Sequence, residues 1–355
     1  MKIAIVLGIR PEIIKFSPIV ENIEYFIIHT GQHYSYSMDK VFFNQLKISQ
    51  PKYKLNVGSG THAEETGKMM IGIEKVLLKE RPTIVLVQGD TNATLAGALA
   101  AVKMLIKVGH VEAGLRSFDR SMPEEINRVL VDHVSDYLFA PTENSKNNLR
   151  KEGISNEKIF VTGNTIVDAV YRNIKLAESS NILKKLDLKE NEYILVTIHR
   201  QENVDNSLKL KNIIKGLKLV RKFTDLPIIY PIHPRSRKRI KEFNLEKHIN
   251  DITLVDPLDY FSFLKLEQKA RLILTDSGGV QEEACILHVP CITLRNNTER
   301  PETIDIGANI LVGTDPDKIL LGVKVMWNNN RRWKNPFGDG RASQRIIEII
   351  CSSLN

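Results

Sequence analysis

The sequence predicts an α/β protein made of two Rossmann-like, doubly wound domains, and three observations support this prediction. Apolar strand-like runs alternate with helix-like segments, which is typical of βαβ units in a parallel sheet. The alternation stops over the polar stretch 176–192 and then begins again. Finally, 355 residues are enough for two domains of ordinary size.

The first half supplies five of the expected strands, each followed by turn residues. They are Ile3–Leu7, Phe26–His29, Ile84–Val87, Lys107–Val111 and Tyr137–Ala140. Helices are expected at 63–79, at 91–103, at 123–135 and after Pro141. Pro11 and Pro123 fit the first turn of a helix, where a missing N–H costs nothing.

The second half repeats the pattern. Strands are expected at Tyr193–Ile198, Ile228–Ile232, Ile252–Val255, Leu272–Leu274 and Cys291–Leu294, with helices between them. The domain boundary is expected near 165–175. In open α/β sheets the ligand lies beyond the carboxyl ends of the strands, so we expect the active site in the cleft between the two domains.

Composition limits the classes of function. The net charge of +8 indicates anionic partners, but the basic residues are spread out apart from a run at 234–241. A phosphorylated small molecule therefore fits better than a nucleic acid. No apolar run reaches the ~20 residues that span a membrane. Three cysteines without a C-x-x-C pattern indicate a reducing compartment, the cytoplasm, with no disulfides and no zinc site.

The strongest local signal is the stretch L-I-L-T-D-S-G-G-V-Q-E-E at 272–283. It predicts a buried strand, a tight turn and a helix capped by Asp276 or Ser277. The two glycines that follow allow a ligand to approach the backbone, and the helix N-terminus attracts anions. Glu282 and Glu283 lie about one turn further on, where a carboxylate can accept hydrogen bonds from sugar hydroxyls.

Other polar residues follow strands in the first half. Arg10 and Lys15 come after the first strand, and Asp90 comes after the strand at 84–87. Glu112 directly follows a buried strand, so desolvation is expected to raise its pKa toward a value useful for a base. Glu124 lies in a first helical turn, where an acidic residue is often only a partner of the helix dipole.

The second half adds His199, His233 and Arg300, each at a strand end or a strand-to-helix turn. No G-x-G-x-x-G follows the first strand and no Walker lysine loop occurs, so NAD and ATP are poorly supported. No histidine or carboxylate cluster has the spacing of metal ligands. These residues predict a two-domain enzyme for an anionic, nucleotide-like ligand.

Taken together, the motifs resemble those of the non-hydrolysing UDP-N-acetylglucosamine 2-epimerases, in family order from about residue 2 to the C-terminus. They include G-I-R-P-E-I-I-K, Q-G-D-T, H-V-E-A-G-L-R, P-E-E-I-N-R, T-I-H-R-Q-E-N, T-D-S-G-G-V-Q-E-E-A and T-E-R-P-E. The resemblance implies the GT-B fold, with a last helix that crosses back onto the first domain. The implied domains are 1–168 with 341–355, and 169–340.

The resemblance also implies a reaction. UDP-N-acetylglucosamine and UDP-N-acetylmannosamine interconvert by elimination of UDP to a 2-acetamidoglucal, followed by readdition of UDP. The implied enzyme is a homodimer, uses no cofactor and supplies precursors of surface polysaccharides and glycans. Three alternatives remain: a hydrolysing epimerase that releases N-acetylmannosamine and UDP, a GT-B glycosyltransferase, and a catalytically dead sensor, which the retained acids disfavour.

Site residues are implied by motif position. Asp90, Glu112 and Glu124 would move protons or support those that do, and His199 would lie beside the glycosidic phosphate. The implied substrate contacts are Arg10, Lys15, Phe263, Ser277, Gly278, Gly279, Glu283 and Arg300, with Glu283 at the ribose and Phe263 at the uracil. Gln32 and His233 match a second, regulatory nucleotide-sugar site, but neighbouring residues differ, which leaves activation by substrate open.

Overall fold

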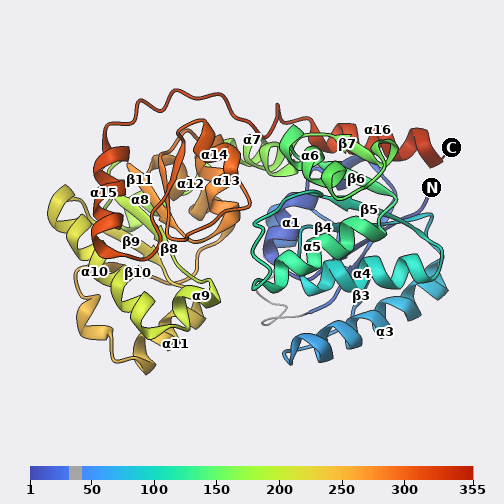
Figure 1. The fold of residues 1–355 in the computed structure, drawn as a ribbon, viewed down its shortest axis with the longest axis horizontal. Helices are drawn as coiled ribbons and strands as arrows, with labels where there is room; N and C mark the ends of the chain where they lie inside the picture. Colours follow the sequence, from blue (N-terminus) through green and yellow to red (C-terminus); the bar gives the residue numbers. More distant parts are fainter. Residues whose placement is uncertain (32–41, 355) are drawn as a thin grey trace. The chain divides into compact units, whose positions relative to one another are not determined.

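The computed structural model describes residues 1–31 and 42–354, which form two compact units (Figure 1). Unit 1 comprises Met1–Tyr171 and Phe337–Asn355, and unit 2 comprises Arg172–Pro336. Each unit is a parallel sheet with helices packed on it, which confirms the predicted α/β class with two doubly wound sheets. Among the described residues, no helix is both long enough and apolar enough to cross a membrane.

The sheet of unit 1 has seven strands in the order β3-β2-β1-β4-β5-β6-β7. Their bounds are β1 Ile3–Leu7, β2 Tyr25–His29, β3 Tyr53–Lys54, β4 Ile84–Gln88, β5 Lys107–Val111, β6 Tyr137–Ala140 and β7 Ile159–Val161. The order reverses between β1 and β4, the position at which open α/β sheets bind ligands. The sequence did not predict β3 and β7, whose two and three residues are too short to form an apolar run.

The helices of unit 1 alternate with these strands. They are α1 Arg10–Phe16, η1 Ile19–Asn22, α3 His62–Glu80, α4 Asn92–Lys103, α5 Pro123–Val134, α6 Glu143–Lys151, η2 Asn156–Lys158, α7 Thr165–Ala177 and α16 Ala342–Leu354. Helix α4 is rich in alanine because it packs closely on the sheet. A Cβ at Gly97 would lie 3.0 Å from Val87 and 3.1 Å from Val6. This contact holds α4 against the two strands at the reversal point.

Unit 2 repeats the design with six strands in the order β10-β9-β8-β11-β12-β13. The strands are β8 Ile194–Thr197, β9 Ile228–Pro231, β10 Thr253–Val255, β11 Leu272–Thr275, β12 Cys291–Thr293 and β13 Asn309–Leu311. Here the order reverses between β8 and β11, which pair from Leu272↔Ile194 to Thr275↔Thr197. The sequence did not predict the three-residue strand β13.

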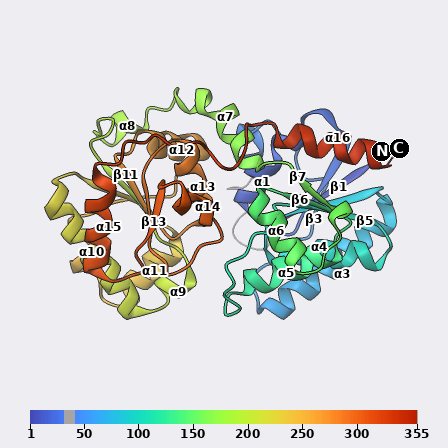
Figure 2. The ribbon, with the colours of Figure 1, turned by 45° about the horizontal axis from the view of Figure 1, so that its top comes forward.

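The helices of unit 2 cover both faces of its sheet. They are α8 Ile182–Lys185, α9 Gln201–Val204, α10 Ser207–Thr224, α11 Pro234–Glu242, η3 Glu246–His248, α12 Tyr260–Lys269, α13 Gly278–Ile286, α14 Pro301–Asp305 and α15 Pro316–Trp327. Helices α10 and α15 lie side by side (Figures 1 and 2) and enclose one apolar core with the sheet. Helices α12 and α13 contribute to the core on the other face.

The last helix, α16, belongs to unit 1 and packs against η1. Asp168 on α7 holds its first turn, because the carboxylate accepts hydrogen bonds from the N–H groups of Ala342 at 3.2 Å and Ser343 at 2.8 Å. The N–H of Asn164 donates to the carbonyl of Phe337 at 2.8 Å. The unit bounds at Tyr171 and Phe337 come from contacts within the chain, and the division at 168/169 and 340/341 stays a prediction.

We expect Asp168→Ala to lower the free energy of unfolding by about 1–2 kcal/mol, because the first turn of α16 loses its acceptor. Urea unfolding followed by circular dichroism measures this effect. Asp317→Ala, in the exposed first turn of α15, is the matched control and should cost no more than about 0.5 kcal/mol. Equal losses for the two variants would contradict the role assigned to Asp168.

Candidate functional site

Glu112, at the end of β5, has an unusual backbone. Its φ of +73° lies in the left-handed region, which side chains other than glycine rarely adopt. Such a conformation costs about 1–3 kcal/mol and is concentrated at functional sites. The N–H of Glu112 donates to the carbonyl of Phe139 at 3.1 Å, which helps to fix this backbone. The strain thus marks the strand end that the sequence predicted to be functional.

The carboxylate of Glu112 is held by a buried ion pair. Its Oε1 lies 2.6 Å from Nζ of Lys15, and Gln88 donates to its Oε2. Lys15 is 5% exposed and Glu112 is 6% exposed. The structure thus brings together residues from the ends of β4 and β5 and from α1. The sequence had predicted Lys15 as a phosphate ligand, and the side chain instead contacts Glu112, so phosphate binding stays a prediction.

Asp90 follows β4 and is not the cap of the next helix. Thr91 caps α4, since its hydroxyl accepts a hydrogen bond from the N–H of Thr94 at 3.1 Å. The half-buried carboxylate of Asp90 accepts a hydrogen bond from Arg128 on α5. Asn127 donates to the carbonyl of Asp90 at 2.9 Å. Helix α5 therefore positions the turn that carries Asp90.

The two glutamates of P-E-E-I-N-R differ in environment. Glu125 is 3% exposed, and its carboxylate accepts hydrogen bonds from the N–H groups of Ser117 and Phe118, each at 2.9 Å, and from Arg128 at 2.6 Å. Glu125 is therefore part of the framework. Glu124 is half-buried at the start of α5, and its catalytic role stays a prediction.

The turn after β1 is fixed by Glu12, which the sequence analysis did not single out. Its Oε2 accepts from the N–H groups of Gly8 at 2.5 Å and Ile9 at 3.1 Å, and its Oε1 accepts from the hydroxyl of Thr91 at 2.6 Å. Burial raises the pKa of Glu12, and these hydrogen bonds oppose the shift. Arg10 begins α1 next to this turn, with its guanidinium 5.1 Å from the ring centre of Phe42.

A second buried network lies behind Glu112. Nδ1 of His110 is 2.7 Å from Asp132, and its Nε2 is 2.8 Å from the carbonyl of Gly89. Arg116 lies 2.7 Å from the other oxygen of Asp132. Burial opposes ionisation, but His110 and Arg116 bring the pKa of Asp132 below its ordinary value. No local pattern predicted this network, because its members are 16 to 22 residues apart.

In unit 2, Asp276 joins the ends of β8 and β11. The side chain is fully buried and accepts hydrogen bonds from the N–H groups of His199 at 3.0 Å and Arg200 at 3.1 Å. Asn203 donates to it at 3.1 Å. Ser277, next in sequence, is the N-cap of α13. The sequence left both residues open as the cap, and the structure assigns them different roles.

His199 is placed by this carboxylate. Its Nδ1 lies 3.3 Å from Asp276, and its side chain is 42% exposed. Desolvation lowers the pKa of His199, and the charge of Asp276 opposes the shift. The ring centre of His233 lies 6.1 Å from that of His199. Nδ1 of His233 caps α11 by accepting from Arg235 at 3.2 Å. Gln32, predicted for the same regulatory site as His233, lies outside the described residues.

The N-terminus of α13 meets an arginine from the turn before α14. A Cβ at Gly278 would lie 2.6 Å from a terminal nitrogen of Arg300, so only glycine leaves room for the guanidinium. Arg300 donates to Glu282 at 2.9 Å and to Glu299 at 3.1 Å. Arg300 therefore holds Glu282, and the contact of Glu283 with a ribose stays a prediction. The arrangement offers a guanidinium and helix N–H groups to an anion.

Gly279, Glu283 and Phe263 complete the candidate surface of unit 2. A Cβ at Gly279 would meet only the hydroxyl of Ser277, at 4.0 Å, so the first turn of α13 is open at this point. Glu283 is 7% exposed one turn further along α13. Phe263 on α12 is partly buried against the core beneath α13. These residues lie on two packed helices, beside the strand ends at the reversal point.

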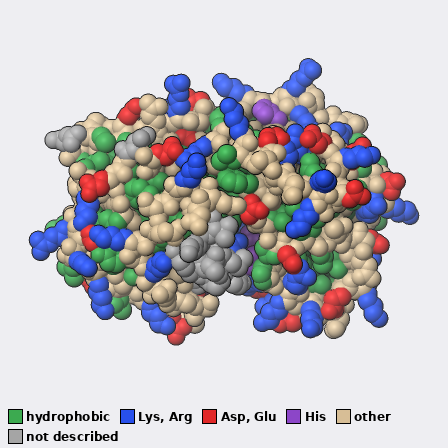
Figure 3. Space-filling model, turned by 180° about the vertical axis from the view of Figure 1, so that it is seen from behind, with side chains coloured by type: hydrophobic (Ala, Val, Ile, Leu, Met, Phe, Trp, Pro, Cys, Tyr) green, Lys and Arg blue, Asp and Glu red, His purple; other side chains and the backbone are tan. Residues whose placement is uncertain are grey.

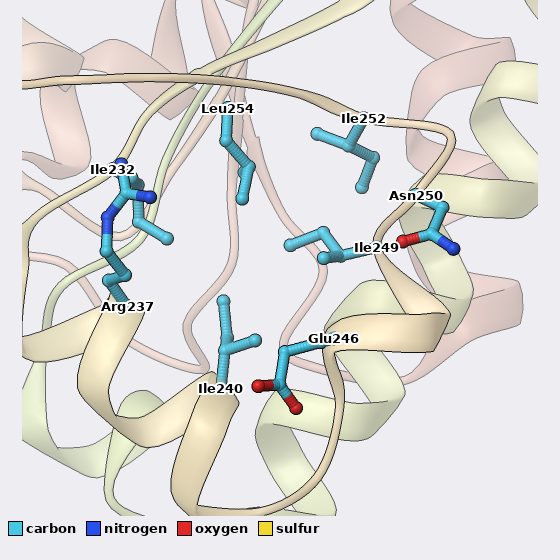
Figure 4. A pocket seen from close by; sticks show the side chains of 8 residues that line it. All are labelled: Ile232, Arg237, Ile240, Glu246, Ile249, Asn250, Ile252 and Leu254. Carbon is cyan, nitrogen blue, oxygen red and sulfur yellow. The ribbon is translucent and has the colours of Figure 1, made fainter.

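A cavity of about 310 Å³ lies elsewhere in unit 2. Figure 4 shows apolar side chains around it from Ile232 after β9, from α11, from β10 and from the segment between α11 and β10, with Arg237, Glu246 and Asn250 among them. None of the predicted site residues lines it. We therefore assign the cavity to incomplete packing at the edge of the sheet.

The basic run at 234–241 forms α11, and its three arginines pair with acidic residues. Arg235 and Arg239 both contact Asp205, at 3.2 Å and 2.8 Å, and Arg237 contacts Asp256 at 2.7 Å. On the face drawn in Figure 3, basic and acidic side chains are interspersed. This agrees with a solvated helix face rather than a nucleic-acid surface. Within residues 1–31 and 42–354, no group of three or more His, Cys, Asp or Glu is arranged to hold a metal ion.

The chain is similar in sequence to one family of known proteins. The family model described as UDP-N-acetylglucosamine 2-epimerase matches residues 19–351. Proteins with this name from Methanocaldococcus jannaschii and Methanococcus maripaludis are 59% and 54% identical to the chain. The first match covers 99% of both chains, and the second covers 98% of both.

The fold has a close counterpart among solved structures. The crystal structure of the M. jannaschii UDP-GlcNAc 2-epimerase in complex with UDP-GlcNAc and UDP has a TM-score of 0.95 and 59% identity, covering 99% of this chain and 100% of that chain. These matches confirm the predicted resemblance and the GT-B fold with two Rossmann-like domains.

We expect Lys15→Met to lower the free energy of unfolding by about 3 kcal/mol, because it leaves the Glu112 carboxylate buried without its cation. Adding Glu112→Gln should restore part of this loss, and urea unfolding of the two single variants and the double variant measures the coupling. Lys107→Met is the control, since its ion pair with Asp136 is exposed and should contribute less than about 1 kcal/mol. Additive losses for Lys15 and Glu112 would refute the buried pair.

Proposed function

The chain belongs to the UDP-N-acetylglucosamine 2-epimerase family of isomerases, and we propose that it interconverts UDP-N-acetylglucosamine and UDP-N-acetylmannosamine without hydrolysis. The observation that carries the proposal is the distribution of charge between the units. Acids follow β4 and β5 in unit 1, and an anion-binding helix N-terminus with Arg300 follows β11 in unit 2.

In this proposal, unit 2 binds the UDP part of the substrate. The first turn of α13, with Ser277, Gly278 and Gly279, and the guanidinium of Arg300 hold the diphosphate. Glu283 accepts hydrogen bonds from the ribose hydroxyls, and Phe263 packs on the uracil. His199 contacts the phosphate that carries the sugar. Fixed N–H groups and a guanidinium suit a leaving group whose negative charge increases as its bond breaks.

Unit 1 supplies the acid–base chemistry. A carboxylate takes the proton from C2 of the sugar while the bond from C1 to the phosphate oxygen breaks. The electron pair of the C2–H bond forms the C1–C2 double bond, and UDP leaves with the electrons of the C1–O bond. For the return, UDP adds to C1 and an acid delivers a proton to the opposite face of C2. Delivery to two faces needs more than one acid–base group, and Asp90, Glu112 and Glu124 are the proposed set.

The carboxylates of Asp90, Glu112 and Glu124 are held by different contacts. Lys15 and Gln88 both contact Glu112, so its carboxylate is held in one orientation. Asp90 has one arginine partner at the edge of the turn, and Glu124 lies half-buried at a helix start. Lys15 and Arg10 are proposed to contact the diphosphate as well. A substrate phosphate reaching Lys15 would release the Glu112 carboxylate for proton transfer.

The proposal includes a homodimer that works in the cytoplasm. Unit 1 exposes apolar side chains on α3 and α5: Ile71 and Leu78 are 56% and 60% exposed, and Ile126 and Leu130 are 41% and 45% exposed. Both helices pack on α4, and exposed apolar residues on its two neighbours support self-association. The three free cysteines support a reducing compartment.

Proton NMR of the purified protein with UDP-N-acetylglucosamine in D₂O tests the reaction. We expect UDP-N-acetylmannosamine to appear and deuterium to accumulate at C2 of both sugars, because the C2 proton exchanges with solvent in the elimination. Release of free N-acetylmannosamine and UDP would instead identify a hydrolysing epimerase. Absence of exchange at C2 would refute the epimerase proposal. Glycosyl transfer to added acceptors would then be the activity to test.

We expect Asp90→Asn and Glu124→Gln each to lower kcat by about 10²- to 10⁴-fold, since each removes a group that transfers protons. The dissociation constant for UDP should change little, because neither Asp90 nor Glu124 is among the proposed UDP contacts. Steady-state kinetics and calorimetry measure the two effects. Glu143→Gln, on the exposed part of α6, is the control with unchanged kcat. Loss of UDP binding in step with kcat would argue that these residues bind substrate instead.

A further inference from the structure

Helix α12 carries two buried polar side chains with unmet hydrogen-bonding capacity. Glu267 is 0% exposed and Tyr260 is 3% exposed. Within the described part of the chain, neither carboxyl oxygen of Glu267 nor the hydroxyl of Tyr260 has a hydrogen-bond partner of good geometry. Buried carboxyl groups are nearly always paired, because removing them from water is costly. The residues around Glu267 should therefore explain why an unpaired carboxyl group is buried here.

The surroundings of Glu267 are apolar except in one direction. Its helix contributes to a core that includes Tyr193, Ala284 and Cys291. The charged group that acts on it is Glu283, on the adjacent helix α13. Tyr193 and Cys291 lie close enough to sense a charge on Glu267, but burial is the larger effect and raises the pKa values of both, so both remain neutral.

Tyr260 lies on the same face of α12 as Glu267, since the two are seven residues apart. Glu283 also acts on Tyr260. Burial, followed by the charge of Glu283, raises the pKa values of both Tyr260 and Glu267 well above their ordinary values. Two adjacent buried carboxyl groups cannot both be ionised, and the more deeply buried one keeps its proton.

We propose that Glu267 is a positioning residue whose protonated carboxyl, together with the Tyr260 hydroxyl, donates to Glu283 and holds that carboxylate oriented toward the two ribose hydroxyls of a nucleoside diphosphate. The inference rests on the proposed function, which places Glu283 at the ribose. It assigns a new role to a residue of the core. A neutral donor beneath the carboxylate fixes its orientation without competing with the ligand for its charge.

Calorimetry with two nucleotides, UDP and 2′,3′-dideoxy-UDP, tests this role. We expect Glu267→Leu to weaken UDP binding by about tenfold and to change dideoxy-UDP binding by less than about twofold, since only UDP uses the oriented carboxylate. Glu267→Gln should keep most of the affinity for UDP, because its amide still donates to Glu283. The readout is the ratio of the two dissociation constants in each protein.

Thermal unfolding separates positioning from a structural role. Glu267→Leu should raise the midpoint, because it removes a buried polar group from an apolar core. The raised pKa in the folded state means that Glu267 favours folding least at high pH. Parent stability therefore falls relative to the Leu variant as the pH rises above the ordinary glutamate value of 4.5. We expect the midpoint difference to be larger at pH 8 than at pH 5.

Four outcomes would each overturn part of the proposals. An unchanged ratio of the two dissociation constants in Glu267→Leu would refute positioning of Glu283. A lowered midpoint with equal weakening of both nucleotides would assign Glu267 a structural role instead. A parent protein that binds no UDP would refute both this inference and the proposed function. A parent that binds UDP without epimerising would refute the proposed reaction alone, and the ratio would still decide the role of Glu267.

Discussion

One buried carboxylate in each unit ties together the two strand ends at which the sheet order reverses. In unit 1, Glu12 after β1 accepts from the hydroxyl of Thr91 after β4. In unit 2, Asp276 after β11 accepts from the backbone N–H of His199 after β8. Strands that end at a reversal point leave N–H groups without partners in the sheet, and these groups must be paired when buried. The carboxylates satisfy them and fix the turns that carry the candidate residues.

The same division between framework and site occurs where two acids are adjacent. Glu125 and Glu282 are fully paired within the chain, with Arg128 and Arg300 respectively. Their neighbours Glu124 and Glu283 are the ones proposed to meet the substrate. In each pair, the member bound to an arginine anchors its helix, and the other member is thereby held in a defined place. A charge change at the arginine-bound member would disturb the site without touching substrate.

The sequence predicted the fold class because long apolar strands and glycine-rich turns are local signals. Strands β3, β7 and β13 were not predicted, because two or three residues are too few to show a hydrophobic pattern. The candidate site residues were predicted from their positions at strand ends. Their partners were not: Lys15 meets Glu112 across 97 residues of sequence, and only the order of the sheet brings them together. Gln88 and Asp276 lie beside predicted residues, so a search of every strand end would have included them.

Arg300 shows how the framework prepares a binding group before a ligand arrives. Glu282 and Glu299 hold its guanidinium against Gly278, so binding an anion there costs little additional side-chain entropy. The carboxylates of Glu282 and Glu299 also offset the positive charge of Arg300. In the proposed function, the attraction for a diphosphate therefore depends strongly on the N–H groups and dipole of α13, whose first turn carries no acidic residue. It follows that the glycines of this turn matter for affinity as well as for space, because any side chain there would keep an anion away from the backbone.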